Sequence, residues 1–202
     1  MTLIGKFIQR LKQQKNTAHF YNPYHNPDLA NNLKYYLNYM MNIPGKRVLL
    51  VGEAPGYKGC KHTGIPFTSG GIFQEIDHPL INQLKGKITI NQLESENTAS
   101  IVWRHMVNCR LTPLFWNAFP FHPHPQNKPD QNRTPTQIEI NKGLGYLINL
   151  QEIYQAEVIA GIGKVGTNSA QRAFPDVNIE YIRHPSFGGK SKFITGSNLI
   201  LN

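Results

Sequence analysis

Cysteine is scarce in this chain, whose 202 residues include only Cys60 and Cys109. Two cysteines can build neither a disulfide framework nor a four-thiolate metal site, and so low a number is typical of proteins from a reducing compartment. We therefore expect no cofactor that depends on cysteine ligands.

Long apolar runs are also absent. No uninterrupted stretch approaches the roughly 18 apolar residues that a membrane-spanning helix requires, so we predict no transmembrane segment. The amino terminus instead spaces apolar residues from Leu3 to Leu11 at helical intervals, with Lys6 and Arg10 between them. The interruption by charge argues against a signal peptide and favours a docked amphipathic helix; a transit peptide or a helix on a membrane surface is the alternative.

Acidic residues are few, with 12 Asp and Glu against 21 Lys and Arg and a net charge of +9. This balance favours a polyanionic partner, although an ordinary basic protein has the same composition. Hydrophobic residues make up 40% of the chain and charged ones 16%, which is typical of a globular protein with a real core. We expect a single domain over residues 1–202, with a helical part at 1–47 and a core at 48–202.

Four short apolar runs are each followed at once by a small or polar motif, and this repetition is the most informative feature of the chain. Apolar runs without alternation indicate strands that are buried on both faces of a parallel sheet. Ligands bind beyond the carboxyl ends of such strands, so we expect Glu53, Asn117 and His184 to converge in one pocket. The four predicted strands cover residues 48–51, 114–116, 158–160 and 179–183.

Helix signals separate the predicted strands. A helix is expected from Pro27 to the Pro-Gly pair at 44–45, and a capping box, Thr136 with Glu139, opens another that ends near Tyr154. The alternation indicates a three-layer α/β/α sandwich around a short, mainly parallel four-stranded sheet. Helical segments are also expected within 72–84, 101–109 and 163–173, and loops at 56–71, 85–97 and 121–135.

The motif Gly52-Glu53-Ala54-Pro55-Gly56 places one carboxylate among small residues that let a substrate approach the backbone. A strand-terminating turn explains the glycines and the proline but not Glu53. No Gly-Lys-Ser/Thr follows and the G-x-G-x-x-G spacing is missing, so the motif is neither a P-loop nor a dinucleotide fingerprint. Glu53 is therefore a candidate for holding a water molecule.

Three further side chains suit the recognition of a nucleobase. Phe67, fixed behind a proline, could stack on a planar base, and Asn117 offers a donor and an acceptor to a base edge. His184, followed by Pro185, suits a donor to an oxygen that gathers negative charge. The structural alternatives are a buried loop anchor, an ordinary strand-end Asn and a structural His.

Several histidines and Cys60 raise the question of a metal site. Their spacing matches no known zinc pattern, and a proline separates His122 from His124, so we expect no metal. The other residues considered are His62 and His105.

Ordered motifs from about Val48 to Asn202 resemble those of the uracil-DNA glycosylase superfamily. The GEAPG motif at 52–56 is similar to the water-activating motif of the iron-sulfur branch, usually called family 4. His184-Pro185-Ser186 resembles the second superfamily motif. Two more segments are similar to motifs of family 4. Gly64-Ile65-Pro66-Phe67, followed by Gly70 and Gly71, resembles the GxPFxGxxG motif. Asn132-Arg133-Thr134-Pro135-Thr136, with Glu139, resembles the NRxPTxxE motif.

The resemblance is incomplete at the iron-sulfur cluster. Family 4 holds a four-iron cluster with four cysteines; here the amino-terminal CxxC is missing, and Phe121 and Gly143 stand where the later two cysteines would be. The chain therefore resembles a cluster-free relative. In the best-known branch, a Tyr at the position of Gly56 excludes thymine from the base pocket by its bulk. With glycine at this position the steric filter is missing, unless Tyr57 replaces it. The basic, His-bearing loop of the DNA-crosslinking branch is not recognisable here.

The resemblance implies a monofunctional DNA glycosylase that hydrolyses the N-glycosidic bond of uracil or another deaminated base in base excision repair, with no cofactor. We expect the protein to bind DNA that contains such a base, to have no membrane partner and to be a monomer. We expect it in the cytoplasm, associated with the nucleoid if the protein is bacterial. The alternatives are a catalytically weak nucleic-acid-binding relative and an enzyme on free nucleobases, which would not need the positive charge. The implied catalytic residues are Glu53 and His184; those for the base are Gly52, Ala54, Pro55, Gly56, Phe67 and Asn117; those for DNA are Ser186, Phe187, Gly188, Lys190 and Lys192.

Overall fold

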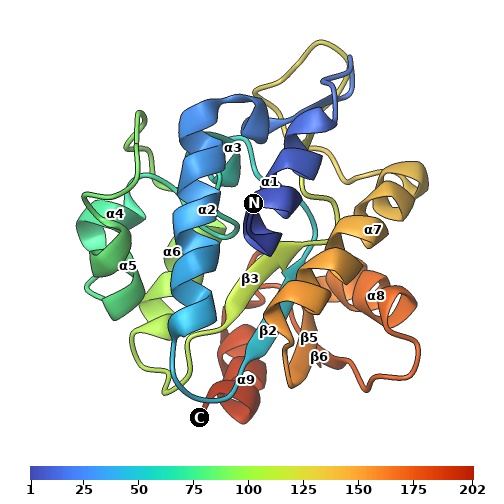
Figure 1. Cartoon of the computed structure of the whole chain (residues 1–202). Coiled ribbons are helices and arrows are strands. Elements are labelled where there is room, and N and C mark those ends of the chain that lie inside the picture. Colours follow the sequence, from blue (N-terminus) through green and yellow to red (C-terminus); the bar gives the residue numbers. More distant parts are fainter.

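A four-stranded parallel sheet in the order β3-β2-β5-β6 forms the centre of the molecule (Figure 1). This computed structural model describes residues 1–202. All residues of β2 and β3 are buried, because helices cover the sheet. The three-layer α/β/α architecture predicted from the sequence is confirmed. The strands are β2 (Val48–Gly52), β3 (Leu114–Asn117), β5 (Val158–Ile162) and β6 (Glu180–Ile182).

The strand order reverses beside β2. From β2 the chain crosses to β3 on one side, and it then returns to β5 on the other side. Such a switch point leaves a crevice at the carboxyl ends of the strands, because the connections there lead away in opposite directions. The motif that follows β2 therefore opens into a crevice.

Nine α-helices surround the sheet, and the two longest begin at the predicted positions. Asn26 caps α2, and Thr136 with Glu139 forms the expected capping box of α7. The helices are α1 (Leu3–Gln13), α2 (Pro27–Asn42), α3 (Cys60–Thr63), α4 (Ile72–Glu75), α5 (Pro79–Leu84), α6 (Asn97–Met106), α7 (Gln137–Tyr154), α8 (Gly163–Ala173) and α9 (Lys190–Leu201). A short 3₁₀ helix η1 (Pro23–His25) and a two-stranded antiparallel pair, β1 (Phe20–Tyr21) with β4 (His122–Pro123), complete the elements.

Helix α1 docks on the protein through its apolar stripe, as the sequence predicts. Ile4, Phe7, Ile8 and Leu11 are buried, and the ring of Phe7 lies 5.4 Å from that of Trp116 in β3. In Figure 1 this helix lies in front of the sheet beside α2 and α7. None of the helices combines the length and the apolar character that a bilayer crossing requires.

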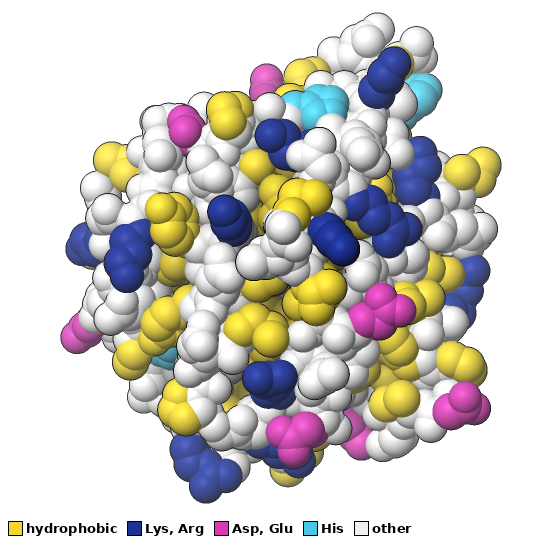
Figure 2. All heavy atoms as spheres, viewed as in Figure 1, with side chains coloured by type: hydrophobic (Ala, Val, Ile, Leu, Met, Phe, Trp, Pro, Cys, Tyr) yellow, Lys and Arg dark blue, Asp and Glu magenta, His cyan; other side chains and the backbone are white.

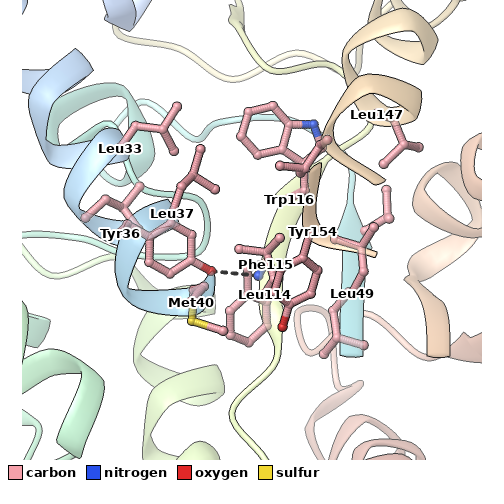
Figure 3. Packing of buried hydrophobic residues seen from close by; sticks show 14 of the residues in the cluster. Leu33, Tyr36, Leu37, Met40, Leu49, Leu114, Phe115, Trp116, Leu147 and Tyr154 are labelled. Carbon is pink, nitrogen blue, oxygen red and sulfur yellow. Dashed lines mark hydrogen bonds between the residues drawn. The ribbon is translucent and has the colours of Figure 1, made fainter. Parts of the chain in front are cut away.

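Helix α2 protects the free edge of β3 (Figure 3). Its buried Tyr36 accepts a hydrogen bond from the backbone N–H of Phe115 through the phenol oxygen, at 2.7 Å. An edge strand otherwise presents unpaired N–H groups that favour aggregation. Leu33, Leu37 and Met40 of the same helix point toward the same cluster of buried side chains.

Four local predictions need correction. The loop at 56–71 contains the short helix α3, and the loop at 121–135 contains β4, which pairs with a segment far away in the sequence. Helix α6 begins four residues before the predicted Ile101, because the Glu96 carboxylate accepts hydrogen bonds from the N–H groups of Thr98 and Ala99. Helix α9 was not predicted; its Phe193 is buried against His105 of α6, so tertiary packing supports it.

Candidate active site

A cavity of about 850 Å³ lies at the carboxyl ends of β2, β3 and β5. Glu53, Asn117 and His184 all line it, together with Phe67. The structure thus brings together Glu53, Asn117 and His184, the three side chains expected to converge from the strand ends, and adds Phe67 from the loop after β2.

The backbone of Glu53 is fixed by the sheet. The β2–β3 pairing continues beyond the strands, since the N–H groups of Ala118 and Phe119 donate to the carbonyls of Gly52 and Glu53 at 2.9 and 3.0 Å. Partial burial raises the pKa of the Glu53 carboxyl above its ordinary value of 4.5, and the Thr134 side chain offsets part of this rise. A carboxylate with a raised pKa is a better proton acceptor near neutral pH than an ordinary Glu.

Asn117 ends β3 level with Gly52 of β2 and is only 3% exposed. Its side chain lines the cavity, and no group of the chain hydrogen-bonds to its amide. Buried polar groups nearly always have partners, so an unpartnered amide at a cavity wall is well suited to bind a ligand.

Phe67 holds its ring against the cavity in a strained conformation. Its φ of 58° is unusual for a bulky residue, and the indole N–H of Trp103 donates to its carbonyl at 2.9 Å. The ring lies on Gly52, where a Cβ would clash with it, and 5.1 Å from the ring of Phe115. Strain of this kind persists only where the surroundings enforce it, often at functional sites.

The neighbours of His184 determine its tautomer. The Nδ1 atom lies 3.3 Å from the backbone N–H of Ser186, which can only donate, and 2.6 Å from the Ser186 hydroxyl. Nδ1 is therefore an acceptor, and in the neutral ring Nε2 carries the proton. Burial, together with the nearby Arg183, lowers the pKa of His184 below its ordinary value of 6.5, which keeps the ring neutral at pH 7.

The remaining predicted site residues divide into two groups. Ala54, Pro55 and Gly56 line the cavity, whereas Gly52 lies behind the Phe67 ring. Of the residues predicted to contact DNA, Ser186 and Phe187 line the cavity and the other three do not. Phe187 is 97% exposed and has a φ of 51°, and Gly188, Lys190 and Lys192 follow it as exposed residues up to the first turn of α9.

Among the cavity residues that the sequence prediction missed, three come from the NRTPT segment: Asn132, Arg133 and Thr134. The Asn132 side-chain oxygen accepts a hydrogen bond from the N–H of Tyr57 at 2.8 Å, and a Cβ on Gly56 would meet Asn132 at 3.9 Å. Tyr57 itself does not line the cavity, so it does not replace the steric filter that Gly56 lacks. The match of the NRTPT segment to the NRxPTxxE motif could have pointed to these residues, but the sequence prediction assigned the segment no role in the site.

The histidines and cysteines considered for a metal site serve other contacts. No group of three or more His, Cys, Asp or Glu residues is arranged to hold a metal ion. The ring nitrogens of buried His122 lie 2.8 and 2.9 Å from the carbonyl oxygens of Pro55 and Pro129. Burial raises the pKa of the Cys60 thiol to about 12, so this thiol is unreactive.

The positions that resemble cluster ligands do not fit an iron-sulfur cluster. Phe121 is fully buried among aromatic rings, 5.3 Å from that of Phe119 and 5.6 Å from that of Tyr146. Gly143 packs so closely on the carbonyl of Ala118 that a side chain there would clash with the backbone. Aromatic packing occupies this region of the protein.

On the face that carries α1 and α2, Lys and Arg side chains are scattered rather than gathered in one patch (Figure 2). Lys164 and Arg183 do line the cavity. Arg133, which is paired with Glu139, lines it as well, so three cationic side chains lie at the candidate site.

Comparison with known proteins decides the family. The family model described as the uracil DNA glycosylase superfamily matches residues 40–196. The chain belongs to this superfamily. Its structure is similar to the crystal structure of wild-type SMUG2 from Pedobacter heparinus, with a TM-score of 0.67 and 15% sequence identity, over 98% of this chain and 96% of that chain. A search of curated proteins finds no match. The superfamily predicted from the motifs is confirmed.

Proposed function

We propose that this member of the uracil DNA glycosylase superfamily hydrolyses the N-glycosidic bond of uracil, or of another deaminated base, in DNA. The proposal is supported by the family match and by the residues that line the cavity. A base inside a duplex cannot reach such a cavity, so the target nucleotide is flipped out of the stack.

The flipped base lies on the ring of Phe67, and the amide of Asn117 hydrogen-bonds to its edge. An amide that has no partner in the chain gains both of its hydrogen bonds only when a base is bound. Ala54, Pro55 and Gly56 are small or compact, so the sugar can approach the backbone beside Glu53.

Hydrolysis then requires a nucleophile and a leaving group. Glu53 orients a water molecule, accepts a proton from it and stabilises the positive charge that develops on the sugar. The water oxygen bonds to C1′ as the bond from C1′ to the base nitrogen breaks, and the bonding pair leaves with the base. His184 donates from Nε2 to the base oxygen that gains this negative charge.

The loop after β6 contacts the DNA strand. Ser186 and the nearby backbone amides bind phosphates beside the flipped nucleotide, and exposed Phe187 enters the gap that the base leaves in the stack. Lys190 and Lys192 extend this surface along the backbone. Such contacts make binding weaken steeply as salt rises.

The observation that carries the proposal is the convergence of Glu53, Asn117 and His184 on one cavity, with the His184 proton held on Nε2. This arrangement provides a base for water and a donor for an anionic leaving group in one cavity.

The test uses end-labelled DNA with a single uracil, opposite guanine or in a single strand. Excision leaves an abasic site that alkali cleaves, and Glu53→Gln should reduce the single-turnover rate by about a thousandfold or more, because a carboxamide cannot accept the proton. Cleavage that Glu53→Gln does not affect would remove Glu53 from the mechanism. Duplex binding without release of uracil, hypoxanthine or xanthine would favour a binding protein with little activity.

A further inference from the structure

We propose that a second cavity, at the amino ends of β2 and β3, binds the phosphate group of a small phosphorylated molecule. This cavity has a volume of about 320 Å³. Its walls come from the end of α2, the turn before β2, the start of α5, the segment before β3 and the end of α7. It therefore lies at the opposite ends of these strands from the candidate active site, and the proposal does not depend on the proposed function.

The charge of this cavity is positive. Three cationic side chains line it, those of Lys46, Arg47 and Arg110, and no acidic side chain does. None of the three forms an ion pair with a carboxylate. Glu157 accepts a hydrogen bond from the backbone N–H of Arg47 at 3.0 Å, but it does not line the cavity. Unpaired positive charge that is gathered in a concave site favours an anionic ligand.

The Arg47 guanidinium is held in place by the chain itself. It donates to the backbone carbonyls of Tyr154 and Met41, at 2.9 and 3.4 Å, and its central carbon lies 5.7 Å from the centre of the Tyr154 ring. These contacts fix its orientation and use only part of its five N–H donors. The remaining donors keep the forked geometry that suits the oxygens of a phosphate group.

A buried hydroxyl without a partner lines the same cavity. Tyr154 is 3% exposed, and no group of the chain hydrogen-bonds to its phenol oxygen. Figure 3 shows this hydroxyl at the end of the ring that points away from Trp116. Burial raises the pKa of Tyr154 to about 12, so the hydroxyl keeps its proton. Buried tyrosine hydroxyls usually have a partner, and an oxygen of a ligand in the cavity provides one here.

Thr112 supplies a second neutral donor. The Nδ1 atom of His78 accepts a hydrogen bond from the Leu80 N–H at 3.1 Å, so in the neutral ring the proton is on Nε2. Burial lowers the pKa of His78, which keeps the ring neutral at pH 7. Nε2 lies 3.4 Å from the Thr112 hydroxyl oxygen, which accepts from it. The hydroxyl proton of Thr112 is therefore free to donate to a ligand in the cavity that this residue lines.

The shape of the cavity favours a small molecule over a phosphate of a DNA backbone. The Tyr154 side chain is almost fully buried, so a ligand has to enter the cavity to reach its hydroxyl, whereas a duplex backbone passes over a surface. The volume is at the low end of the range for ligand cavities. Tyr39, Pro44 and Pro79 provide apolar wall for the part of the molecule that carries the phosphate.

The first experiment is a titration of the full chain, followed by the NMR signals of the backbone amides. Inorganic phosphate and glycerol phosphate are the ligands, glycerol is the matched neutral compound, and sodium chloride keeps the ionic strength constant. We expect saturable shifts with both phosphates at the amides of Lys46, Arg47, Leu111 and Thr112, and none with glycerol. Shifts that do not saturate, or that are spread over all basic parts of the surface, would overturn the proposal.

Variants test the individual donors by the dissociation constant for glycerol phosphate. Tyr154→Phe removes only the hydroxyl and should weaken binding about fivefold, and Arg110→Gln should weaken it about tenfold. The double change Lys12→Gln with Lys15→Gln is the control. It removes twice the charge of Arg110→Gln from exposed positions outside the cavity and should leave binding unchanged. Thermal melting checks that each variant is folded.

Two results would overturn the proposal at this stage. If the control pair weakens binding as much as Arg110→Gln, the attraction is a general effect of net charge and the cavity is not a site. If a DNA duplex without terminal phosphates displaces glycerol phosphate from these amides, the phosphate belongs to a nucleic-acid backbone and the small ligand is wrong. Neither readout needs base excision, so failure of the proposed function leaves this test intact, and the reverse holds as well.

Discussion

The cavity has two walls that are held in different ways. The strand-end wall, Glu53 and Asn117, is fixed by backbone pairing between β2 and β3 and is at least partly buried. The loop wall, Asn132, Thr134 and Phe187, is exposed, and side-chain contacts such as the Arg133–Glu139 pair hold its middle part. Damage to the sheet should therefore cost stability first, whereas damage to the loop wall should cost function first.

The largest expected effect comes from the strand-end wall, in Gly52→Ala. A Cβ at Gly52 would clash with the Phe67 ring, which Phe115 and the Trp103 bond hold in place, so we expect a loss of about 2–3 kcal/mol in the free energy of unfolding. Urea denaturation measures it. Gly56→Ala in the same motif is the control, because its Cβ would meet nothing closer than 3.9 Å and should cost less than about 0.5 kcal/mol. Equal losses would contradict the packing that sets the two glycines apart.

The second effect separates chemistry from stability within the same wall. Asn117→Ala removes an amide that has no partner in the chain, so the free energy of unfolding should change by less than about 0.5 kcal/mol. Excision should fall about a hundredfold if two hydrogen bonds to the base are lost. Asn149→Ala, a change at a partly buried residue of α7 whose amide bonds to Glu152, should alter neither quantity. A large loss of stability with a normal rate would make Asn117 a structural residue.

A smaller effect is expected from the loop wall in Phe187→Ala. The side chain is 97% exposed, so its removal should leave the melting temperature unchanged. Single-turnover excision at low enzyme concentration should fall about tenfold on duplex DNA and less on a single strand, where no stack has to be opened. Leu199→Ala removes another exposed apolar side chain, on α9, and should change neither rate. The same loss on both substrates would show that Phe187 does not act as a wedge.

The smallest effect concerns the support of the loop wall. Thr136→Ala removes the hydroxyl that accepts from the Glu139 N–H at 3.3 Å, and the loss of such a cap costs about 1 kcal/mol. The melting temperature should fall by about 2–4 °C, measured by calorimetry. Thr136→Ser keeps the hydroxyl and should recover most of the loss. If Ser and Ala variants melt alike, the capping bond does not stabilise α7.

Much of the fold was predictable because its signals are local. Each of these signals comes from residues that are close together in the sequence. They are the apolar runs of the buried strands, the helix starts at Asn26 and Thr136, and the amphipathic pattern of α1. Helix α9 was missed, because its stability comes from Phe193 packing on α6 rather than from a start signal of its own. The β1–β4 pair was missed for the same reason, since each strand has only two residues and gains its partner from far along the chain.

The sequence by itself determined that a carboxylate, an amide and an imidazole follow three buried strands, because parallel strands bring their carboxyl ends to one edge. Only the tertiary structure decided the strand order, the acceptor role of His184 Nδ1 and the contact of Arg133 with the His19 carbonyl. The strand order and the Arg133 contact join groups that are distant along the chain, and the His184 contact depends on the conformation of the turn after β6. A pattern of residue types carries no information on such contacts, because their geometry is set by packing over the whole molecule.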